Sequence, residues 1–287
     1  MQNVESHKII LYLCIGIIAL GGFFRAKHYI DNNSLWSDEC YLALDIATRS
    51  FGDIIDNQST LPLQPKPSPG YLVVVKLMTK IFGDNELALR AISFFCGISA
   101  LILFYILLKQ YISGYALLIG LSIFAIAKPL IYFSAEIKPY STDVFAAILL
   151  YLIYAHVVKR GFLFSSSFGL IILGALIMWF SYASLFILSA IGFVLLLRLI
   201  TKKERKYARV LGFCILAWGA SFLVLYTHSI KGMLGNDYLL GSWVYGFMPA
   251  NASWGTKLSW VKDSLLNMFS GVTGITATVL ASVLFMA

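Results

Sequence analysis

Two polar clusters interrupt a chain that is otherwise strongly apolar. The first is the adjacent pair of acids Asp38 and Glu39, which lies between Trp36 and Tyr41. The second is the segment 136–143, which carries four side chains able to bind or react: Glu136, Lys138, Tyr140 and Asp143. A carboxylate can take a proton from a hydroxyl group, and a lysine can stabilise an anionic leaving group. Together the clusters hold the groups that a transfer reaction needs.

The elements that must position these residues are membrane spans. Hydrophobic residues make up 59% of the chain and charged residues 13%, which is far from the average of soluble domains. Asp, Glu, Lys and Arg are absent from seven long runs: 9–24, 91–108, 110–127, 144–158, 161–197, 210–230 and 264–287. The run 161–197 is nearly twice the ~20 residues that cross a bilayer, so we expect two spans with a turn near Phe180–Tyr182. The sequence therefore predicts an all-α polytopic membrane bundle with about eight spans.

The distribution of charge predicts the orientation of this bundle. If the N-terminus is cytoplasmic, the loops on that side carry ten basic residues and two acids, which is the whole formal net charge of +8. Loops rich in Lys and Arg stay in the cytoplasm. Both polar clusters then follow odd-numbered spans and emerge at the outer face, where we expect them to share one site. The excess of basic residues thus indicates the membrane topology, and we expect no nucleic-acid partner.

The first outer loop, residues 25–90, is the largest segment between spans. Its residues 39–55 fit a helix that lies in the membrane interface, because several apolar side chains fall near one face. A proline-rich segment follows, and it should hold Lys66 in a stiff, extended chain. Residues 71–82 fit a second short helix. Arg90 then lies at the outer mouth of the second span.

Two kinds of ligand would suit these residues. Lys66, Arg90 and Lys138 are candidate cations for a phosphate group. The four acids of the two clusters could instead share a divalent cation through their oxygen atoms: Asp38, Glu39, Glu136 and Asp143. Lys76 lies near a helix end, where a lysine usually extends its ammonium group to the interface. The sequence alone leaves the metal question open.

A series of short motifs resembles one family of enzymes. Trp36-Ser37-Asp38-Glu39, Arg49-Ser50-Phe51-Gly52, Pro69-Gly70-Tyr71-Leu72, the segment 82–90 and the segment 131–143 occur in the order and topology found in that family. They resemble the bacterial RgtA/B/C/D-like glycosyltransferases of the GT-C class, which is related to the protein O-mannosyltransferases and the aminoarabinose transferases. The resemblance covers roughly residues 10–160.

The resemblance implies a single GT-C-like transmembrane domain over residues 1–287. It implies transfer of a sugar, with inversion, from a polyprenyl-phosphate donor to a glycan, lipid or protein acceptor at the outer face of the bacterial inner membrane. Asp38 would be the catalytic base, with Glu39 beside it. The second loop would bind substrate through four residues: Glu136, Lys138, Tyr140 and Asp143.

Two other interpretations stay open at the level of sequence. A transporter or flippase of lipid-linked sugars would be expected to carry charges at mid-membrane on broken helices and to show inverted repeats. A non-catalytic fragment or assembly subunit is the other. The last run, 264–287, ends without the basic residues that follow the other spans reaching the cytoplasm. We therefore expect the chain to be the front part of a longer protein.

Overall fold

The computed structural model describes residues 2–55, 66–233, 241 and 246–273, and within these ranges every regular element is a helix. Five helices are long and apolar enough to cross a membrane: α1 (Gln2–Asp31), α5 (Glu86–Leu108), α8 (Tyr140–Lys159), α10 (Ser184–Lys202) and α11 (Arg205–Leu225). A sixth span results if α6 (Gly114–Ile126) is joined to α7 (Lys128–Tyr132) and η1 (Phe133–Ala135), with a bend of 52°. The predicted all-helical architecture is confirmed for the described residues, and these apolar helices are suited to crossing a membrane.

The predicted number of eight spans is not confirmed. Helix α9 (Phe164–Ile177) has 14 residues, fewer than the ~20 needed to cross the hydrocarbon core. The last predicted span, 264–287, begins inside α13 (Trp254–Thr273), and its residues 274–287 lie outside the described part of the chain. The described helices therefore support five or six spans and one shorter apolar helix.

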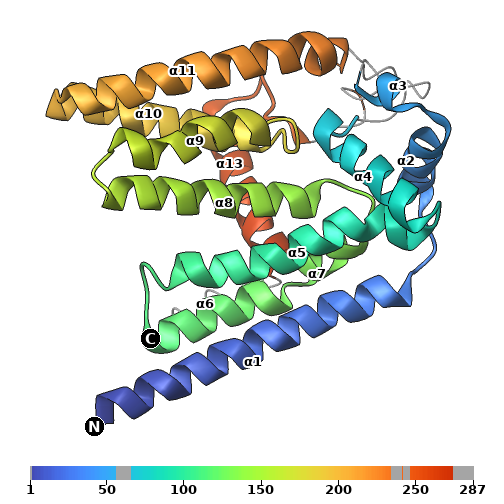
Figure 1. The fold of residues 1–287 in the computed structure, drawn as a ribbon, viewed down its shortest axis with the longest axis horizontal. Coiled ribbons are helices and arrows are strands. Elements are labelled where there is room, and N and C mark those ends of the chain that lie inside the picture. Colours follow the sequence, from blue (N-terminus) through green and yellow to red (C-terminus); the bar gives the residue numbers. More distant parts are fainter. Residues whose placement is uncertain (1, 56–65, 234–240, 242–245, 274–287) are drawn as a thin grey trace.

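The five long apolar helices lie side by side and run along one common direction (Figure 1). The segment between α1 and α5 forms one end of this bundle, which we call the loop end, with α2, α3 and α4. The opposite end, which we call the basic end, holds the turns after α5, α8 and α10. Its basic residues include Lys109, Lys159, Arg160, Lys202, Lys203 and Arg205. The charge asymmetry of the sequence thus corresponds to the two ends of the bundle.

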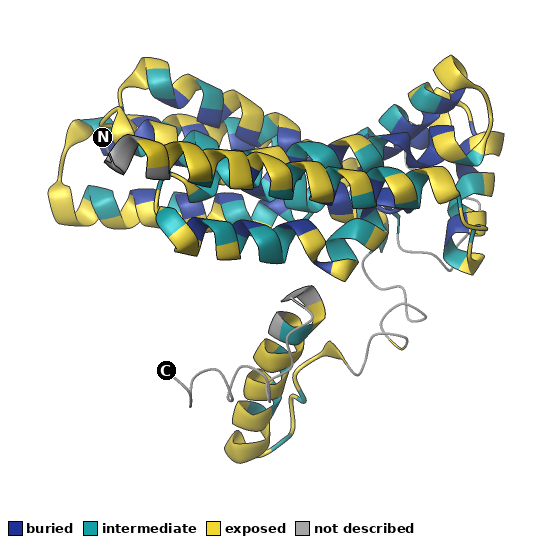
Figure 2. Cartoon of the chain, turned by 90° about the horizontal axis from the view of Figure 1, so that it is seen from below, coloured by how far each residue is buried: buried dark blue, intermediate teal, exposed yellow. Residues whose placement is uncertain are grey.

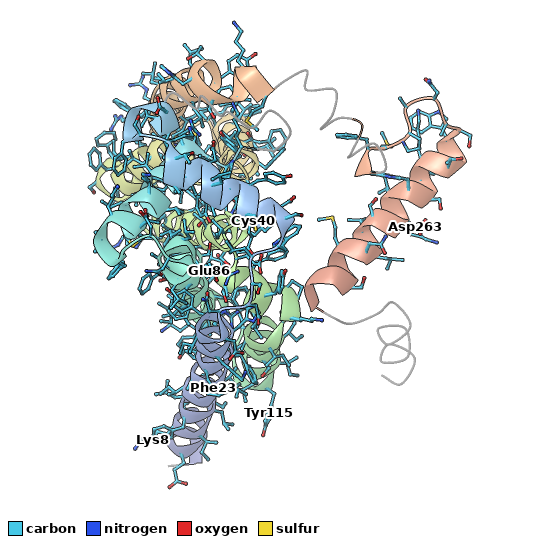
Figure 3. All side chains as sticks on the ribbon, turned by 90° about the vertical axis from the view of Figure 1, so that its right-hand side faces the viewer. Lys8, Phe23, Cys40, Glu86, Tyr115 and Asp263 are labelled. Carbon is cyan, nitrogen blue, oxygen red and sulfur yellow. The ribbon has the colours of Figure 1, made fainter. Side chains whose placement is uncertain are left out.

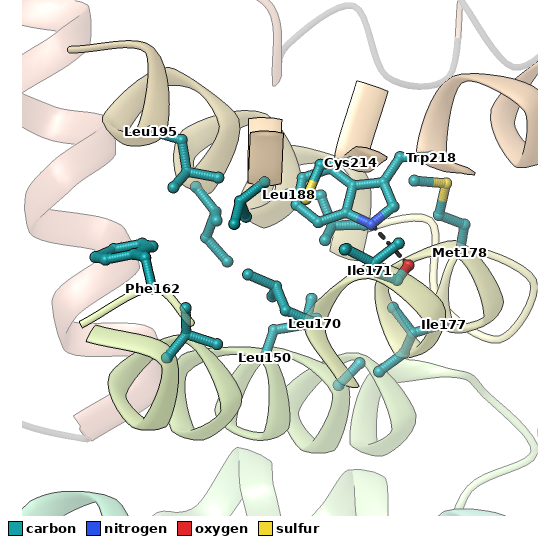
Figure 4. Close-up of a cluster of buried hydrophobic side chains, with 14 of the residues drawn as sticks. Leu150, Phe162, Leu170, Ile171, Ile177, Met178, Leu188, Leu195, Cys214 and Trp218 are labelled. Atoms are coloured by element: carbon teal, nitrogen blue, oxygen red, sulfur yellow. Dashed lines mark hydrogen bonds between the residues drawn. The ribbon is translucent and has the colours of Figure 1, made fainter. Parts of the chain in front are cut away.

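Apolar side chains pack between the helices and also cover the outside of the bundle. Figure 2 shows buried residues on the inner faces of the helices and exposed residues on the outer ones. The largest described cluster joins α8, α9, α10 and α11, and Trp218 donates a hydrogen bond from Nε1 to the carbonyl of Ile171 at 3.1 Å (Figure 4). Gly174 makes room for this indole, because a Cβ there would lie 2.4 Å from Nε1. The exposed apolar exterior suits a protein solvated by lipid.

The predicted turn near Phe180–Tyr182 is confirmed, since α9 ends at Ile177 and α10 begins at Ser184. This turn also contacts the loop helices. The backbone N–H of Gly70 donates to the carbonyl of Trp179 at 2.7 Å, and a Cβ on Gly70 would lie 2.6 Å from that oxygen. Glycine is therefore required for this close approach, which joins α4 (Pro69–Phe82) to the α9–α10 turn.

The predicted single helix over 39–55 is wrong in one respect, because the structure has two helices, α2 (Ser37–Thr48) and α3 (Phe51–Ile55). Ser50 starts the second one: its Oγ accepts from the N–H of Asp53, and its own N–H donates to Asp53 Oδ2 at 3.0 Å. This reciprocal pair is a capping box, which favours a new helix start over continuation.

The other predicted loop helix, over 71–82, is confirmed as α4. Its end is set by Gly83, whose φ of +88° lies in the region that favours glycine. The side chain of Asn85 then accepts from the N–H of Ala88 at 2.9 Å and caps α5. By contrast, α13 lies at the side of the bundle, apart from most of the other helices, and it contacts α7 (Figures 2 and 3).

Candidate functional site

The two polar clusters meet at the loop end of the bundle. Asp38 and Glu39 occupy the first turn of α2. The segment 136–139 lies between η1 and α8. Three side-chain contacts join the segments: Asp38 with Lys138, Trp36 with Glu136, and Glu39 with the backbone N–H of Ile137. Residues about one hundred positions apart thus form one site, as the topology predicts.

Glu39 lies at the buried centre of this site, with 0% of the residue exposed. Its Oε2 accepts from Arg90 Nη2 at 3.1 Å, and its Oε1 accepts from the N–H of Ile137 at 2.7 Å. Arg90 is equally buried and also donates to Asn32 Oδ1 and to the carbonyl of Asn33. One ion pair therefore holds together α2, α5, the segment after η1 and the end of α1. These contacts give Glu39 and Arg90 a structural role, while their predicted roles in catalysis and phosphate binding stay predictions.

Glu136 is the second buried acid of the site. Its Oε2 accepts from the indole N–H of Trp36 at 2.7 Å. Burial raises the pKa of Glu136 above its ordinary value of 4.5, and the negative charge of nearby Glu39 raises it further. Folding therefore favours the protonated form of Glu136.

This shift predicts how stability depends on pH. The folded state keeps the proton of Glu136 to a higher pH than the unfolded chain does, so stability falls as pH rises from about 4.5 through the raised folded pKa. Glu136→Gln stays neutral and lacks this loss. We expect the melting temperature of the variant in detergent to rise relative to wild type across this interval and then to level off. A constant difference in melting temperature between the variant and the wild type from about pH 4 to pH 8 would contradict the raised pKa.

Asp38 and Lys138 form the accessible part of the site. Lys138 Nζ lies 3.2 Å from Asp38 Oδ2, with 34% of the Asp38 side chain and 10% of the Lys138 side chain exposed. The ammonium also lies 5.3 Å from the centre of the Trp36 ring, in a cation–π arrangement. A carboxylate and a cation are thus in contact at a surface that a substrate can reach.

Carbodiimide coupling should detect this pair directly. The reagent activates a carboxylate, and an amine in contact with it displaces the activating group and forms an amide. We expect a cross-linked peptide containing Asp38 and Lys138, found by mass spectrometry after digestion. Lys138→Arg should remove the product because a guanidinium does not couple. The exposed Lys27–Asp31 pair, at 2.6 Å, serves as an internal positive control. Coupling of the control pair alone would show that Asp38 and Lys138 are apart in the protein.

Short polar contacts fix the chain that carries Glu136 and Lys138. Ser93 on α5 donates from Oγ to the carbonyl of Lys138 at 3.0 Å. Ser141 donates to the carbonyl of Phe133 at 2.9 Å. Gly97 allows η1 to approach α5, since a Cβ there would lie 2.7 Å from Ser134 Cβ. The second cluster is therefore held against α5 by these contacts.

Comparison with known proteins adds no family to this description. No family model, no curated protein and no solved structure matches the chain.

Two predicted site residues, Asp143 and Tyr140, lie on α8, where the second cluster ends, and a third, Lys66, lies near the other end of α2. Asp143 accepts from Ser181 Oγ at 2.6 Å, which links α8 to the α9–α10 turn. Tyr140 packs its ring on Phe133, with centroids 4.5 Å apart. Lys66 is near Arg49, and partial burial followed by the Arg49 charge lowers the pKa of its ammonium group.

Lys66 is therefore not grouped with Asp38. Arg49 follows the last residue of α2 and Asp38 occupies its first turn, so roughly 16 Å of helix separates them at 1.5 Å per residue. The open alternative of a shared divalent cation also finds no site in the described part of the chain. Within the described ranges, no group of three or more His, Cys, Asp or Glu side chains could hold a metal ion. The four acids instead accept hydrogen bonds from Arg90, Trp36, Lys138 and Ser181.

Two basic residues are buried against expectation: the sequence predicted Lys76 at the membrane interface and gave no role to Arg25. Lys76, expected at the interface, is only 4% exposed and donates to the carbonyls of Ile46 and Ala47 at 2.7 and 3.0 Å. It thereby supplies donors to the end of α2. Arg25 is 1% exposed within α1. Arg25 directly follows the charge-free run 9–24, and α1 continues past it to Asp31, so this charge lies within the helix and needs a partner.

Proposed function

We propose that this chain is a membrane glycosyltransferase. It takes a sugar from a polyprenyl-phosphate donor and transfers it to an acceptor hydroxyl at the outer face of the bacterial inner membrane. The observation that carries the proposal is the accessible Asp38–Lys138 pair, because it offers a base and a phosphate-stabilising cation in one place. The motif resemblance supports the choice of sugar transfer over other group transfers.

In the proposed reaction Asp38 accepts the proton of the acceptor hydroxyl. The acceptor oxygen forms a bond to the anomeric carbon, and the bond from that carbon to the phosphate oxygen breaks. The polyprenyl phosphate leaves with the electron pair, and Lys138 stabilises its charge. Attack from the side opposite the leaving group inverts the anomeric centre.

This geometry requires the resting pair to open. Base and leaving phosphate must stand on opposite sides of the sugar, whereas Asp38 and Lys138 are 3.2 Å apart. The donor phosphate competes with Asp38 for Lys138, and its binding frees the carboxylate to act as a base. The donor therefore binds before proton transfer.

An apolar pocket supports a lipid-linked donor. It has a volume of about 310 Å³ and lies between α4, α5, α8 and α9. Thr142 and Phe180 line it directly next to the hydrogen-bonded residues Asp143 and Ser181. Leu176, another lining residue, is 53% exposed on the outside of the bundle. An isoprenoid chain entering from the bilayer would meet an apolar lining there, below a phosphate at the loop end.

The proposed orientation follows from the two ends of the bundle. The basic end carries Lys109, Lys159 and Arg160 among its charges, and short loops of this composition remain in the cytoplasm. The loop end with the Asp38–Lys138 pair then faces outward.

A transfer assay tests the proposal. The purified protein in lipid nanodiscs is given a panel of polyprenyl-phosphate sugars and hydroxyl acceptors, and glycosylated product is measured with released polyprenyl phosphate. We expect turnover with at least one donor and inverted stereochemistry in its product. Retained stereochemistry, or no turnover with any donor of the panel, would contradict the proposal.

Donor binding has its own expected result. Saturating polyprenyl phosphate, without a sugar, should suppress carbodiimide coupling of Asp38 to Lys138 because its phosphate occupies the lysine. Coupling of the exposed Lys27–Asp31 pair, which lies within α1, should not change. If transfer proceeds and coupling is unaffected by the lipid, the phosphate binds elsewhere.

A transporter of lipid-linked sugars is the second candidate, because one span is broken between α6 and α7 and a buried charge lies at the break. Broken helices with charged partners are frequent at the binding sites of transporters. Here, however, Arg25 donates to three backbone carbonyls. Movement of a fluorescent lipid-linked sugar across proteoliposomes, without any transfer, would favour this candidate.

A further inference from the structure

The break between α6 and α7 leaves two backbone carbonyls without their usual donors. In an unbroken α-helix the N–H of residue 129 would bond to the carbonyl of Ala125, and the N–H of residue 128 to that of Phe124. Residue 129 is Pro129, which has no N–H. Ala127, with ψ of 113°, takes the chain out of the helix before Lys128. A buried carbonyl without a donor is costly, so another group must supply the bonds.

Arg25 of α1 supplies both bonds. Its Nη1 donates to the carbonyl of Ala125 at 2.9 Å, and its Nη2 donates to that of Phe124 at 3.3 Å. Nη1 also donates to the carbonyl of Gly21 on its own helix at 2.9 Å. The guanidinium is buried, and its positive charge lies at the C-terminal end of α6, where the helix dipole favours a cation.

A second residue, Gly21, allows α1 to approach the break closely. A Cβ on Gly21 would lie 2.9 Å from Ala125 Cβ and 3.1 Å from the carbonyl oxygen of Ala125. Only glycine leaves the space that lets Arg25 reach across. About one helical turn beyond Arg25, His28 packs on Tyr132 of α7, with ring centroids 5.7 Å apart. Helix α1 therefore contacts both sides of the bend (Figure 1).

The bend determines where the second polar cluster goes. Helix α7 leads directly into η1, and η1 leads into Glu136 and Lys138. If α6 continued without a bend, this segment would leave in another direction, and the contacts of η1 with Gly97 and Ser141 would be lost. We propose that Arg25 is a positioning residue: its guanidinium replaces the backbone donors that Pro129 and the bend remove, and it thereby fixes the direction in which the chain delivers Lys138 to Asp38.

The test uses the Asp38–Lys138 coupling yield, which needs no substrate. A failure of the proposed positioning role is therefore distinguishable from a failure of the proposed glycosyl transfer. Arg25→Met removes both donors, and we expect the coupling yield to fall by roughly fivefold or more, as orphaned buried acceptors shift the equilibrium away from the bent form. Arg25→Lys keeps the charge without the planar fork and should give an intermediate yield. Lys27→Met, on the exposed side of α1, is the matched control and should leave the yield unchanged.

A second background keeps the proposal falsifiable if Arg25→Met folds poorly. Pro129→Ala restores the N–H that can bond to Ala125, so losing Arg25 should reduce the coupling yield less in that background than in wild type. Coupling is measured only on protein that elutes as a single species in detergent and keeps its helical circular dichroism. A wild-type yield in folded Arg25→Met overturns the proposal. So does an equal loss of yield, or an equal loss of folded protein, with and without the Pro129→Ala substitution.

Discussion

Asp38→Asn should abolish most sugar transfer and leave the protein folded in the membrane. Asparagine keeps the shape of the side chain, and its oxygen still accepts a hydrogen bond from Lys138, so the contact at 3.2 Å loses only its charge. An amide cannot take the acceptor proton, however, and loss of a general base typically costs about 10²–10⁴-fold in rate. The measurement is the initial rate of product formation at saturating donor and acceptor.

The control for this variant is another acid at the loop end. Asp31→Asn, at the last residue of α1, removes an exposed carboxylate that forms an ion pair with its helical neighbour Lys27. It should transfer sugar at the wild-type rate. Wild-type turnover by Asp38→Asn would remove Asp38 from the role of base, whereas equal losses in both variants would indicate a general effect of charge at this surface.

Much of the fold follows from the placement of charges along the chain. Charge-free runs locate α1, α5, α8, α10 and α11, because a residue of Asp, Glu, Lys or Arg is expensive inside a bilayer. The turn between α9 and α10 follows from the same argument about length. The division of the first loop helix does not, since it depends on the capping box of Ser50 and Asp53, which competes with helix continuation over only a few residues.

The candidate site, too, is only partly predictable from the sequence. Its two clusters can be expected to meet, because both follow odd-numbered spans and so emerge on one side. Tertiary packing decides which side chains pair. Glu39 of α2 pairs with Arg90 near the start of α5, and Asp38 pairs with Lys138. No spacing in the sequence shows that Glu39 is buried while its neighbour Asp38 is accessible. Arg25 is hidden for a similar reason, since its carbonyl partners lie about one hundred residues away.

The buried Glu39–Arg90 pair should dominate the stability of the loop end. Both side chains are almost fully buried, at 0% and 2% exposed, so removing one charge leaves the other desolvated without its counter-charge. Breaking such a pair typically costs about 3–5 kcal/mol. We expect Glu39→Ala to lower the free energy of unfolding by this order, measured by denaturant titration in detergent. It also deprives the N–H of Ile137 of its acceptor.

A double variant distinguishes the effect of breaking the ion pair from a simple loss of packing. Replacing both charges with apolar side chains of similar size, Glu39→Met with Arg90→Met, removes the uncompensated charge, and buried pairs replaced in this way often cost little. We therefore expect the double variant to be more stable than either single one, with a coupling energy well outside the few tenths of a kcal/mol found for independent sites. The exposed Lys27–Asp31 pair, treated identically, should change stability by no more than about 1 kcal/mol. Additive losses at Glu39 and Arg90 would mean that each side chain acts through its other contacts, with Ile137 on one side and with Asn32 and Asn33 on the other.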